Sequence, residues 1–189
     1  VEMLVDATTA DFYFLEMNTR LQVEHPVTEA VSDQDLVALM LRVADGQALP
    51  SELVGSVPPV GWAIESRIYA EDAARGFVPS TGSLTAYANP PASIEFFHKS
   101  DIRVDAAVED GSEVGIFYDP MISKVITRGE DRAAALACMR DALDGYVVEG
   151  LVHNVPFCRD VCSNEAFLSG DYTTAFIEEY YPGGFDEGS

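Results

Sequence analysis

Side chains that could take part in catalysis are concentrated in residues 16–26, with the sequence Glu-Met-Asn-Thr-Arg-Leu-Gln-Val-Glu-His-Pro. In an extended chain every second side chain points the same way, so five polar residues would share one face. They are Glu16, Asn18, Arg20, Gln22 and Glu24. A half-buried strand with a solvated polar side would also explain this alternation. The variety of the polar groups favours a site, because carboxylates, amides and a guanidinium supply cation ligands, an anion clamp and a candidate base.

The elements on either side of this segment can be predicted from local patterns. Two short apolar-rich runs, residues 1–5 and 12–16, flank a polar turn and predict a pair of antiparallel strands. After the segment, Ser32 and Asp35 resemble a capping box at the start of a helix, which Gly46 would end. The apolar face of this helix would consist of Leu36, Met40 and Val43.

The remainder of the chain predicts an α+β fold. Residues 49–59 contain three prolines and predict a loop. Short strand-like runs then recur between turn signals. These runs are residues 62–69, 83–87, 94–97, 102–108 and 121–127. A helix is predicted over residues 131–146, and Asn154 with Pro156 would open another. Strands followed by helices indicate an antiparallel sheet packed against helices.

This pattern predicts four segments. Residues 1–50 form the first, residues 51–60 a linker, residues 61–170 a second domain, and residues 171–189 a C-terminal helix and tail, with the tail frayed from residue 182. A chain that opens at Val1 rather than Met is expected to have lost its original N-terminal portion.

Composition narrows the function classes. Of 189 residues, 48% are hydrophobic, which is typical of a folded globular protein. The 32 Asp and Glu against 11 Lys and Arg give a net charge of -21, which argues against nucleic acid as a partner. These acids are spread along the chain, which indicates either an ordinary solvated surface or adaptation to high salt. The sequence contains no run of about 18 apolar residues, so it predicts no membrane span. The three cysteines have neither disulfide nor zinc spacing, which indicates a reducing compartment.

Residues 16–29 resemble, nearly residue for residue, the signature of biotin carboxylases within the ATP-grasp superfamily. The resemblance continues through residues 63–72, 77–82 and 118–124, so it covers nearly the whole chain. It implies the C-terminal part of an ATP-grasp domain followed by the biotin carboxylase C-terminal domain. The Tyr-Ala-Glu-Asp sequence at residues 69–72 and the ending Tyr-Pro-Gly-Gly-Phe look most like the propionyl-CoA carboxylase α subunits, the biotin-containing subunits of acyl-CoA carboxylases.

The resemblance also implies an ATP and metal site in the first segment. Glu2, Glu16 and Asn18 match the residues that hold magnesium or manganese bridging the ATP phosphates, and oxygen ligands suit such hard cations. Glu16 thereby also belongs to the ATP site. Leu4 and Leu15 match positions that line the adenine pocket, although both would also serve as plain core residues.

The carboxylation chemistry is assigned by the same resemblance. Arg20, Gln22 and the backbone of Val23 would bind bicarbonate, with Glu24 beside the Arg20 guanidinium. Glu24 would remove the proton of bicarbonate, so that the dianion attacks the γ-phosphate of ATP and forms carboxyphosphate. Arg67 would bind biotin and stabilise its enolate-like anion. The alternative for Arg67 is a weak surface pair with a neighbouring acid.

Several parts of a complete carboxylase are not recognised in these 189 residues. They are the glycine-rich ATP loop, the phosphate-binding lysines, the Met-Lys-Met biotin attachment motif and the carboxyltransferase. We therefore expect this segment to be inactive alone and to work in an oligomeric enzyme with a biotinylated carrier domain and a carboxyltransferase subunit. Its compartment would be the mitochondrial matrix in a eukaryote and otherwise the cytoplasm. Two alternatives remain: an ATP-grasp ligase acting on another carboxylate without biotin, and a non-catalytic scaffold subunit.

Overall fold

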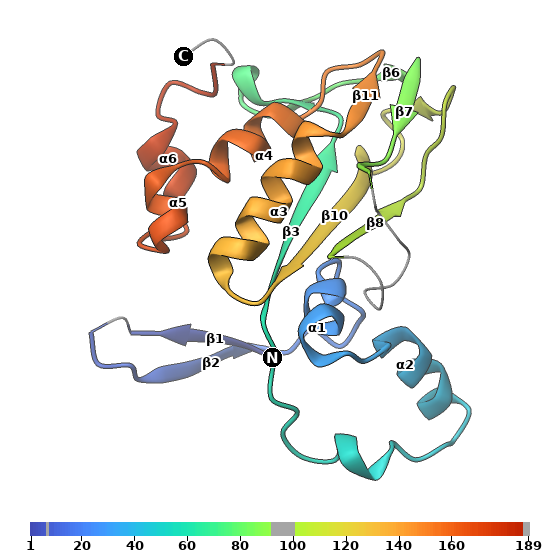
Figure 1. Ribbon diagram of the computed structural model, residues 1–189, viewed down its shortest axis with the longest axis vertical. Coiled ribbons are helices and arrows are strands. Elements are labelled where there is room, and N and C mark those ends of the chain that lie inside the picture. The colour runs from blue at the N-terminus through green and yellow to red at the C-terminus, as the bar shows by residue number, and fades with distance from the viewer. Residues whose placement is uncertain (7, 92–100, 187–189) are drawn as a thin grey trace.

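The computed structural model describes residues 1–6, 8–91 and 101–186. The chain begins with a β-hairpin of β1 (Glu2–Val5) and β2 (Phe12–Glu16), which pair antiparallel with Glu2 opposite Glu16. The carboxylate of Asp6 accepts hydrogen bonds from the N–H groups of Thr8 and Thr9 and so closes the turn. The predicted antiparallel pair is thus confirmed, and it extends away from the rest of the molecule (Figure 1).

The segment after the hairpin is not an extended strand. β2 ends at Glu16, and residues 17–24 belong to no strand, with a bend at Arg20 and a turn at residues 23–24 before α1 (His25–Ser32). The prediction of an extended strand through Glu24 is therefore wrong. A physical reason is Pro26, which lies in the first turn of α1, where a proline is pre-organised for a helix.

The predicted capping box at Ser32 is also wrong. Ser32 is the last residue of α1, and its hydroxyl donates to the carbonyl of Thr28. Asp35 instead caps a second helix, α2 (Leu36–Ala44), by accepting from the N–H of Ala38 at 2.7 Å. The predicted stop at Gly46 is confirmed, because Gly46 has φ 82° and donates to the carbonyl of Val43. The 3₁₀ turn η1 (Ser51–Leu53) follows in the predicted loop.

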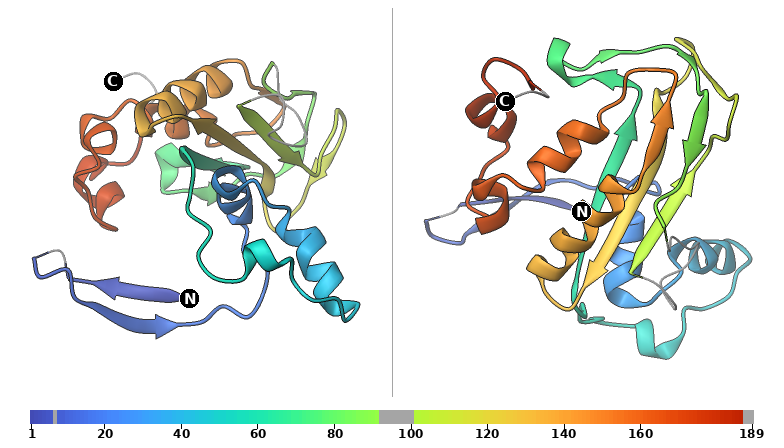
Figure 2. Two further views of the ribbon diagram at one scale, coloured as in Figure 1. Left: turned by 60° about the horizontal axis from the view of Figure 1, so that its bottom comes forward. Right: turned by 45° about the horizontal axis from the view of Figure 1, so that its top comes forward.

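An antiparallel sheet forms the centre of the molecule, as predicted. Its order is β3 (Trp62–Tyr69), β10 (Met121–Gly129) and β8 (Ile102–Ala106). α3 (Arg132–Asp144), capped by Asp131, packs on one face, and α1 lies against the other (Figure 2). Leu136, Met139 and Leu143 are buried, which confirms the predicted apolar face of α3. Since both faces of the central strand are covered, β10 is buried from Ile122 to Thr127.

Three two-stranded ladders extend this sheet region. They pair β4 (Glu71–Asp72) with β5 (Val78–Pro79), β6 (Gly82–Ser83) with β9 (Glu113–Val114), and β7 (Ala86–Ala88) with β11 (Val147–Glu149). The 3₁₀ turn η2 (Ala73–Arg75) connects β4 to β5. The strand predicted over residues 83–87 is therefore divided between β6 and β7. The strand predicted over residues 94–97 lies outside the described residues.

Three short helices close the chain: α4 (Val155–Val161), α5 (Glu165–Ser169) and α6 (Phe176–Tyr180). The helix predicted after Asn154 is confirmed. Phe157 of α4 lies edge-on to Tyr181 and Phe185, with ring centroids 5.1 and 5.6 Å apart. The tail predicted to fray from residue 182 is therefore packed at least as far as Phe185. Among the described residues, none of the helices has the length and apolar character that a membrane crossing requires.

Candidate active site

The predicted metal ligands lie together at the base of the hairpin. Glu2 and Glu16 are cross-strand partners, and the amide nitrogen of Asn18 donates to the Glu2 carboxylate at 2.6 Å. Like charges directly opposite each other are destabilising in a sheet, so a bound cation would relieve this pair. Within the described residues, no three or more His, Cys, Asp or Glu side chains gather as a metal site, so the predicted set would include the Asn18 oxygen as its third ligand. These oxygen donors fit a hard divalent cation.

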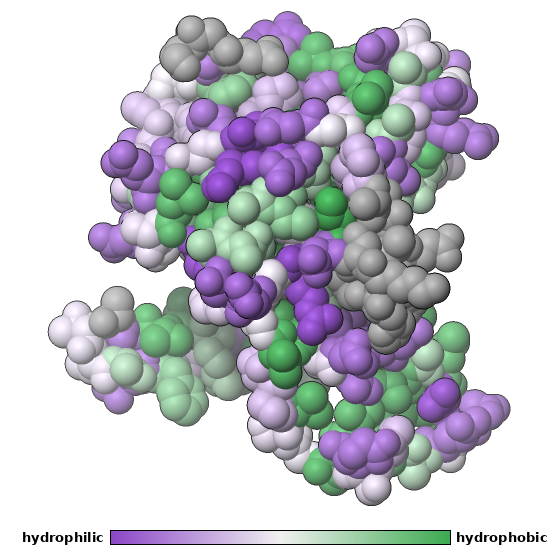
Figure 3. Space-filling model, in the orientation of Figure 1, coloured by the Kyte–Doolittle hydropathy of each residue, from purple (hydrophilic) through white to green (hydrophobic). Residues whose placement is uncertain are grey.

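The two leucines predicted for the adenine pocket are exposed on the surface of the hairpin. Leu4 is 58% exposed and Leu15 is 52% exposed. Leu15 falls at an irregularity in the register, where Glu2 pairs with Glu16 but Met3 pairs with Phe14. Every residue of β1 and β2 is exposed, and Figure 3 shows hydrophobic side chains on the surface of this hairpin.

The bend at residues 20–24 is held by contacts with its own backbone. Arg20 donates from Nη1 to the carbonyl of Leu21 at 3.3 Å. The carbonyl of Gln22 is 2.8 Å from Nδ1 of His25 and accepts from the His25 N–H at 3.2 Å. His25 therefore fixes the start of α1 and the peptide that follows Gln22.

Glu24 pairs with Arg67 in this structure. Arg67 donates from Nη2 to the Glu24 carboxylate at 2.8 Å, across 43 positions of sequence. The resemblance predicted Arg20 as the neighbour of Glu24, whereas the side chain of Arg20 in this structure contacts the carbonyl of Leu21. Both side chains of the pair stay open to solvent, with 40% of Arg67 and 48% of Glu24 exposed, so a ligand can reach them.

Arg67 projects from the edge strand β3, on the face of the sheet that α1 covers. Its strand is fixed by Asn154, whose side chain accepts from the N–H of Tyr69 and donates to the carbonyl of Arg67. Burial alone would lower the pKa of the Arg67 guanidinium, but Tyr69, Glu65 and Glu24 raise it overall. The guanidinium therefore stays charged.

A buried carboxylate lies beside Arg67 on the same strand. The side chain of Glu65 is only 5% exposed, and Nε of Arg67 lies 3.5 Å from its Oε1. Its Oε2 has no hydrogen-bond partner among the described residues. Burial raises the pKa of Glu65 above its ordinary value, while the charges of Lys124 and Arg67 act in the opposite direction.

A chain of ion pairs joins the first part of the molecule to the sheet. Glu29 of α1 pairs with Arg103 of β8 at 2.7 Å, and Arg103 also pairs with Asp105 at 2.7 Å. Lys124 of β10 continues the chain through Asp105 at 3.2 Å and donates to the carbonyl of Val23 at 2.9 Å. Burial would raise the pKa of Asp105, but Arg103 and Lys124 lower it overall, so its carboxylate is ionised.

Glu65 and Lys124 were not among the predicted site residues. The sequence does contain a signal for Lys124, because a lysine inside the strand-like run at residues 121–127 is unusual, and a lysine is rarely buried without a partner. Glu65 lies two positions from Arg67 on β3, a spacing that puts both side chains on one face of a strand.

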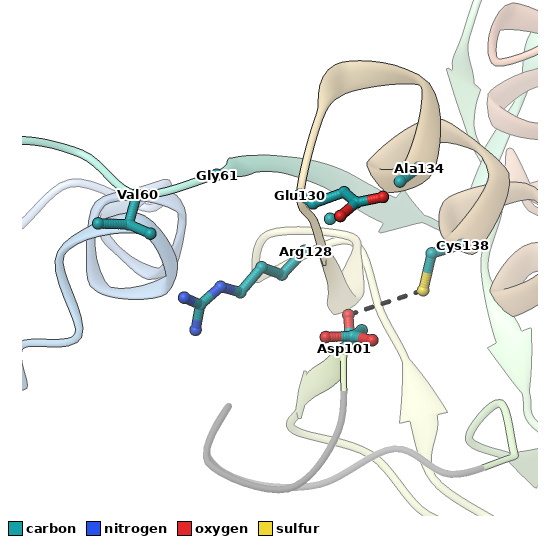
Figure 4. A pocket seen from close by; sticks show the side chains of 8 residues that line it. Val60, Gly61, Asp101, Arg128, Glu130, Ala134 and Cys138 are labelled. Carbon is teal, nitrogen blue, oxygen red and sulfur yellow. Dashed lines mark hydrogen bonds between the residues drawn. The ribbon is translucent and has the colours of Figure 1, made fainter.

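A cavity of about 650 Å³ lies at the C-terminal end of β10 (Figure 4). Its lining contains none of the predicted site residues. The residues around it are Val60, Gly61, Asp101, Arg128, Gly129, Glu130, Ala134 and Cys138.

This α+β fold is shared with biotin carboxylases. The family described as "Biotin carboxylase C-terminal domain" matches residues 65–179, and "Carbamoyl-phosphate synthase L chain, ATP binding domain" matches residues 1–52. The chain belongs to the biotin carboxylase family. The resemblance predicted from the sequence is confirmed.

Individual relatives agree with this assignment. The propionyl-CoA carboxylase alpha chain, mitochondrial, of Caenorhabditis briggsae is 50% identical over 186 residues, which cover 98% of this chain and 24% of the relative. The propionyl-CoA carboxylase alpha chain of Ruegeria pomeroyi is 50% identical over 199 residues, covering 98% of this chain and 29% of the relative. The chain thus spans about a quarter of the length of these curated relatives.

Solved structures share the fold. The biotin carboxylase domain of thermophilic 2-oxoglutarate carboxylase, solved with bicarbonate bound, superposes with a TM-score of 0.85 at 35% identity. The match covers 95% of this chain and 38% of that domain. The predicted fold class, the C-terminal part of an ATP-grasp domain followed by the biotin carboxylase C-terminal domain, is thereby confirmed.

Proposed function

We propose that this chain supplies the carboxylation half of a biotin carboxylase module, which carboxylates biotin with bicarbonate at the expense of ATP. The observation that carries the proposal is the Glu24–Arg67 ion pair of 2.8 Å. It brings a candidate base for bicarbonate and a candidate cation for the biotin anion into contact from two separate parts of the fold. The bicarbonate bound to the related 2-oxoglutarate carboxylase domain supports the same assignment.

In the proposed reaction the residues of the bend act first. Arg20, Gln22 and the backbone of Val23 orient bicarbonate, and Glu24, which lies 2.8 Å from the Arg67 guanidinium, accepts its proton. The bicarbonate oxygen then forms a bond to the γ-phosphorus while the bond from that phosphorus to ADP breaks, which yields carboxyphosphate. A positioned base contributes about 10²- to 10⁴-fold to such a step.

Arg67 acts in the second half of the reaction. Carboxyphosphate releases CO₂ and phosphate, and a ureido nitrogen of biotin gives its proton to that phosphate and bonds to the carbon of CO₂. Negative charge develops on the ureido oxygen before this bond forms, and the Arg67 guanidinium stabilises that charge. Because Arg67 already pairs with Glu24, the two groups can respond to one another's charge as the proton moves.

The hairpin supplies the nucleotide end of the proposed site. Glu2, Glu16 and Asn18 would hold Mg²⁺ or Mn²⁺, which when bound neutralises charge on the ATP phosphates. Leu4 and Leu15 would contact adenine. Their exposed apolar side chains leave a surface on which the base of the nucleotide can lie.

The whole enzyme is proposed from the same relatives. It would be an oligomeric acyl-CoA carboxylase, most similar to those that act on propionyl-CoA, with a biotinylated carrier domain and a carboxyltransferase subunit. We retain the proposed division into residues 1–50, 51–60, 61–170 and 171–189. A eukaryotic source would place the enzyme in the mitochondrial matrix and a bacterial source in the cytoplasm, since relatives of both kinds exist.

The test is ATP hydrolysis by a joined module, in which this chain continues the N-terminal half of a propionyl-CoA carboxylase α chain. We expect phosphate release that requires bicarbonate and rises with free biotin, and none from this chain alone. Phosphate release that depends on another carboxylic acid and ignores bicarbonate would identify a different ATP-grasp ligase. A folded joined module that binds a carboxyltransferase subunit without any turnover would indicate a scaffold.

A further inference from the structure

Lys124 lies at a buried position of a strand, where a lysine is unusual. It lies on β10, the middle strand of the central sheet, and is only 8% exposed. The residues before and after it on the strand, Ser123 and Val125, are buried as well. Removing an ammonium group from water is costly unless it is paired, so the contacts of Lys124 show what its charge is used for.

The ammonium group has one contact on each side of the junction between the two parts of the chain. Towards the sheet, Nζ lies 3.2 Å from Oδ2 of Asp105, which Arg103 also holds. Towards the first part, Nζ donates to the carbonyl of Val23 at 2.9 Å. Lys124 therefore connects an anchored carboxylate of the sheet to the backbone of the bend.

This contact determines the direction of a peptide group in the proposed bicarbonate site. A trans peptide is planar, and its C=O and N–H point in opposite directions. Since Lys124 holds the carbonyl of Val23, the N–H of Glu24 is directed the other way. His25 holds the carbonyl of Gln22 in the same manner, which directs the N–H of Val23. Two consecutive peptides of the bend are thus fixed by side chains from outside it.

Lys124 also contributes charge to a site rich in carboxylates. Its charge acts on Glu65, whose buried Oε2 has no hydrogen-bond partner among the described residues. Glu65 in turn lies against Arg67, the partner of Glu24. One ammonium group therefore contacts the backbone next to the proposed base and balances the carboxylate behind the proposed biotin-binding arginine.

We propose that Lys124 is a positioning residue of the carboxylation site, which fixes the Val23–Glu24 peptide so that the bend binds bicarbonate. The expected effect of Lys124 on catalysis rests on the proposed function. Its expected effect on the order of the backbone at residues 22–25 does not. It assigns Lys124 no contact with ATP and no role in proton transfer.

The catalytic test compares Lys124→Met with Arg128→Met in the joined module. Arg128 is a matched control, because it lies on the same strand but lines the cavity at the C-terminal end of that strand (Figure 4). Loss of a hydrogen bond from a charged donor predicts that Lys124→Met raises the KM for bicarbonate about tenfold or more. The KM for ATP should stay within about twofold, and Arg128→Met should change neither. Equal loss for both substrates, or no change in either, would overturn the proposal.

A second measurement uses the chain itself and needs no turnover. Hydrogen exchange is compared between wild type, Lys124→Met and Arg128→Met. Lys124→Met should speed exchange at residues 22–25 while α3 remains protected, and Arg128→Met should match wild type. Unchanged exchange in the bend would contradict the proposal whether or not the joined module is active. If Lys124→Met does not fold, Lys124→Gln takes its place, because the glutamine side chain is too short to reach both Val23 and Asp105. Faster exchange at residues 22–25 would then support the proposal, and unchanged exchange there would contradict it.

Discussion

The two parts of the chain that contribute to the site are stabilised in different ways. In the sheet domain, Ile122 and Val125 are fully buried in the core that contains α3, and Ile126 is buried on the other face against Ala30 of α1. In residues 1–52, both hairpin strands are exposed along their whole length and α2 has no buried residue. Figure 3 shows hydrophobic surface over the hairpin and α2, at the lower edge of the molecule.

The difference shows that the two halves of the site depend on different forces. Arg67 and Lys124 project from strands that a hydrophobic core holds in place. The bend that carries Arg20 and Glu24 is joined to those strands mainly through polar contacts, which are directional and individually modest. We therefore expect local opening of the first part to need less free energy than opening of the core.

The largest expected effect is on the free energy of unfolding, from a substitution in the hydrophobic core of the sheet domain. Leu136→Ala removes a fully buried side chain of α3 and should lower the free energy of unfolding by about 2–5 kcal/mol. Leu41→Ala on α2, where the side chain is 67% exposed, should change it by less than about 0.5 kcal/mol. Urea denaturation of both variants measures the contrast, and similar losses in the two would show that α2 is as well packed as α3.

The next largest effect is expected on catalysis, from a substitution of Arg67 on the sheet. Arg67→Met in the joined module should reduce biotin-dependent turnover by about 10²- to 10³-fold, as expected for removal of a group that stabilises developing charge. The exposed Arg75, changed to Met, is the control. Steady-state rates with and without biotin provide the measurement. If Arg67→Met and the control have equal rates, Arg67 forms a surface ion pair and has no role in catalysis.

A smaller effect concerns the buried carboxylate of the sheet. Because the pKa of Glu65 is raised in the folded protein, the folded state binds its proton more tightly than the unfolded state does. Stability should therefore fall as pH rises from the ordinary value of 4.5 through the raised value. Glu65→Gln should remove this slope and be more stable at neutral pH by about 1 kcal/mol. Urea denaturation across the acidic range tests it, and an unchanged slope in the variant would refute it.

The smallest expected effect concerns the hairpin. Mg²⁺ should slow hydrogen exchange in β1 and β2, since it would relieve the repulsion between Glu2 and Glu16. At a concentration equal to its Kd, the stabilisation is about 0.4 kcal/mol. Glu2→Gln should abolish the response, and exchange in α3 should not respond in either protein. Equal slowing in the variant would mean that the cation binds elsewhere.

Local patterns in the sequence predicted much of the fold. Apolar periodicity and turn residues located the hairpin, the three main strands and α3. The boundary between α1 and α2 was missed, because it depends on Glu29, whose carboxylate accepts the N–H of Leu36 seven residues later while also binding Arg103. A capping pattern within four residues does not contain that information.

The site was predicted only in part for the same reason. Its residue types and the resemblance identified Arg20, Glu24 and Arg67 as candidates. Their arrangement depends on contacts that span 43 positions between Glu24 and Arg67, and 101 positions between Val23 and Lys124. Such contacts follow from the packing of α1 against the sheet, which no local pattern specifies.

The central claim is that Glu24 and Arg67 join the two regions into one site for carboxylating biotin. The most direct measurement is transfer of labelled bicarbonate to free biotin by the joined module and by its Glu24→Gln variant. We expect ATP-dependent formation of labelled carboxybiotin by the wild-type module and a loss of about 10²- to 10⁴-fold in the variant. Equal labelling by the two proteins would contradict the account.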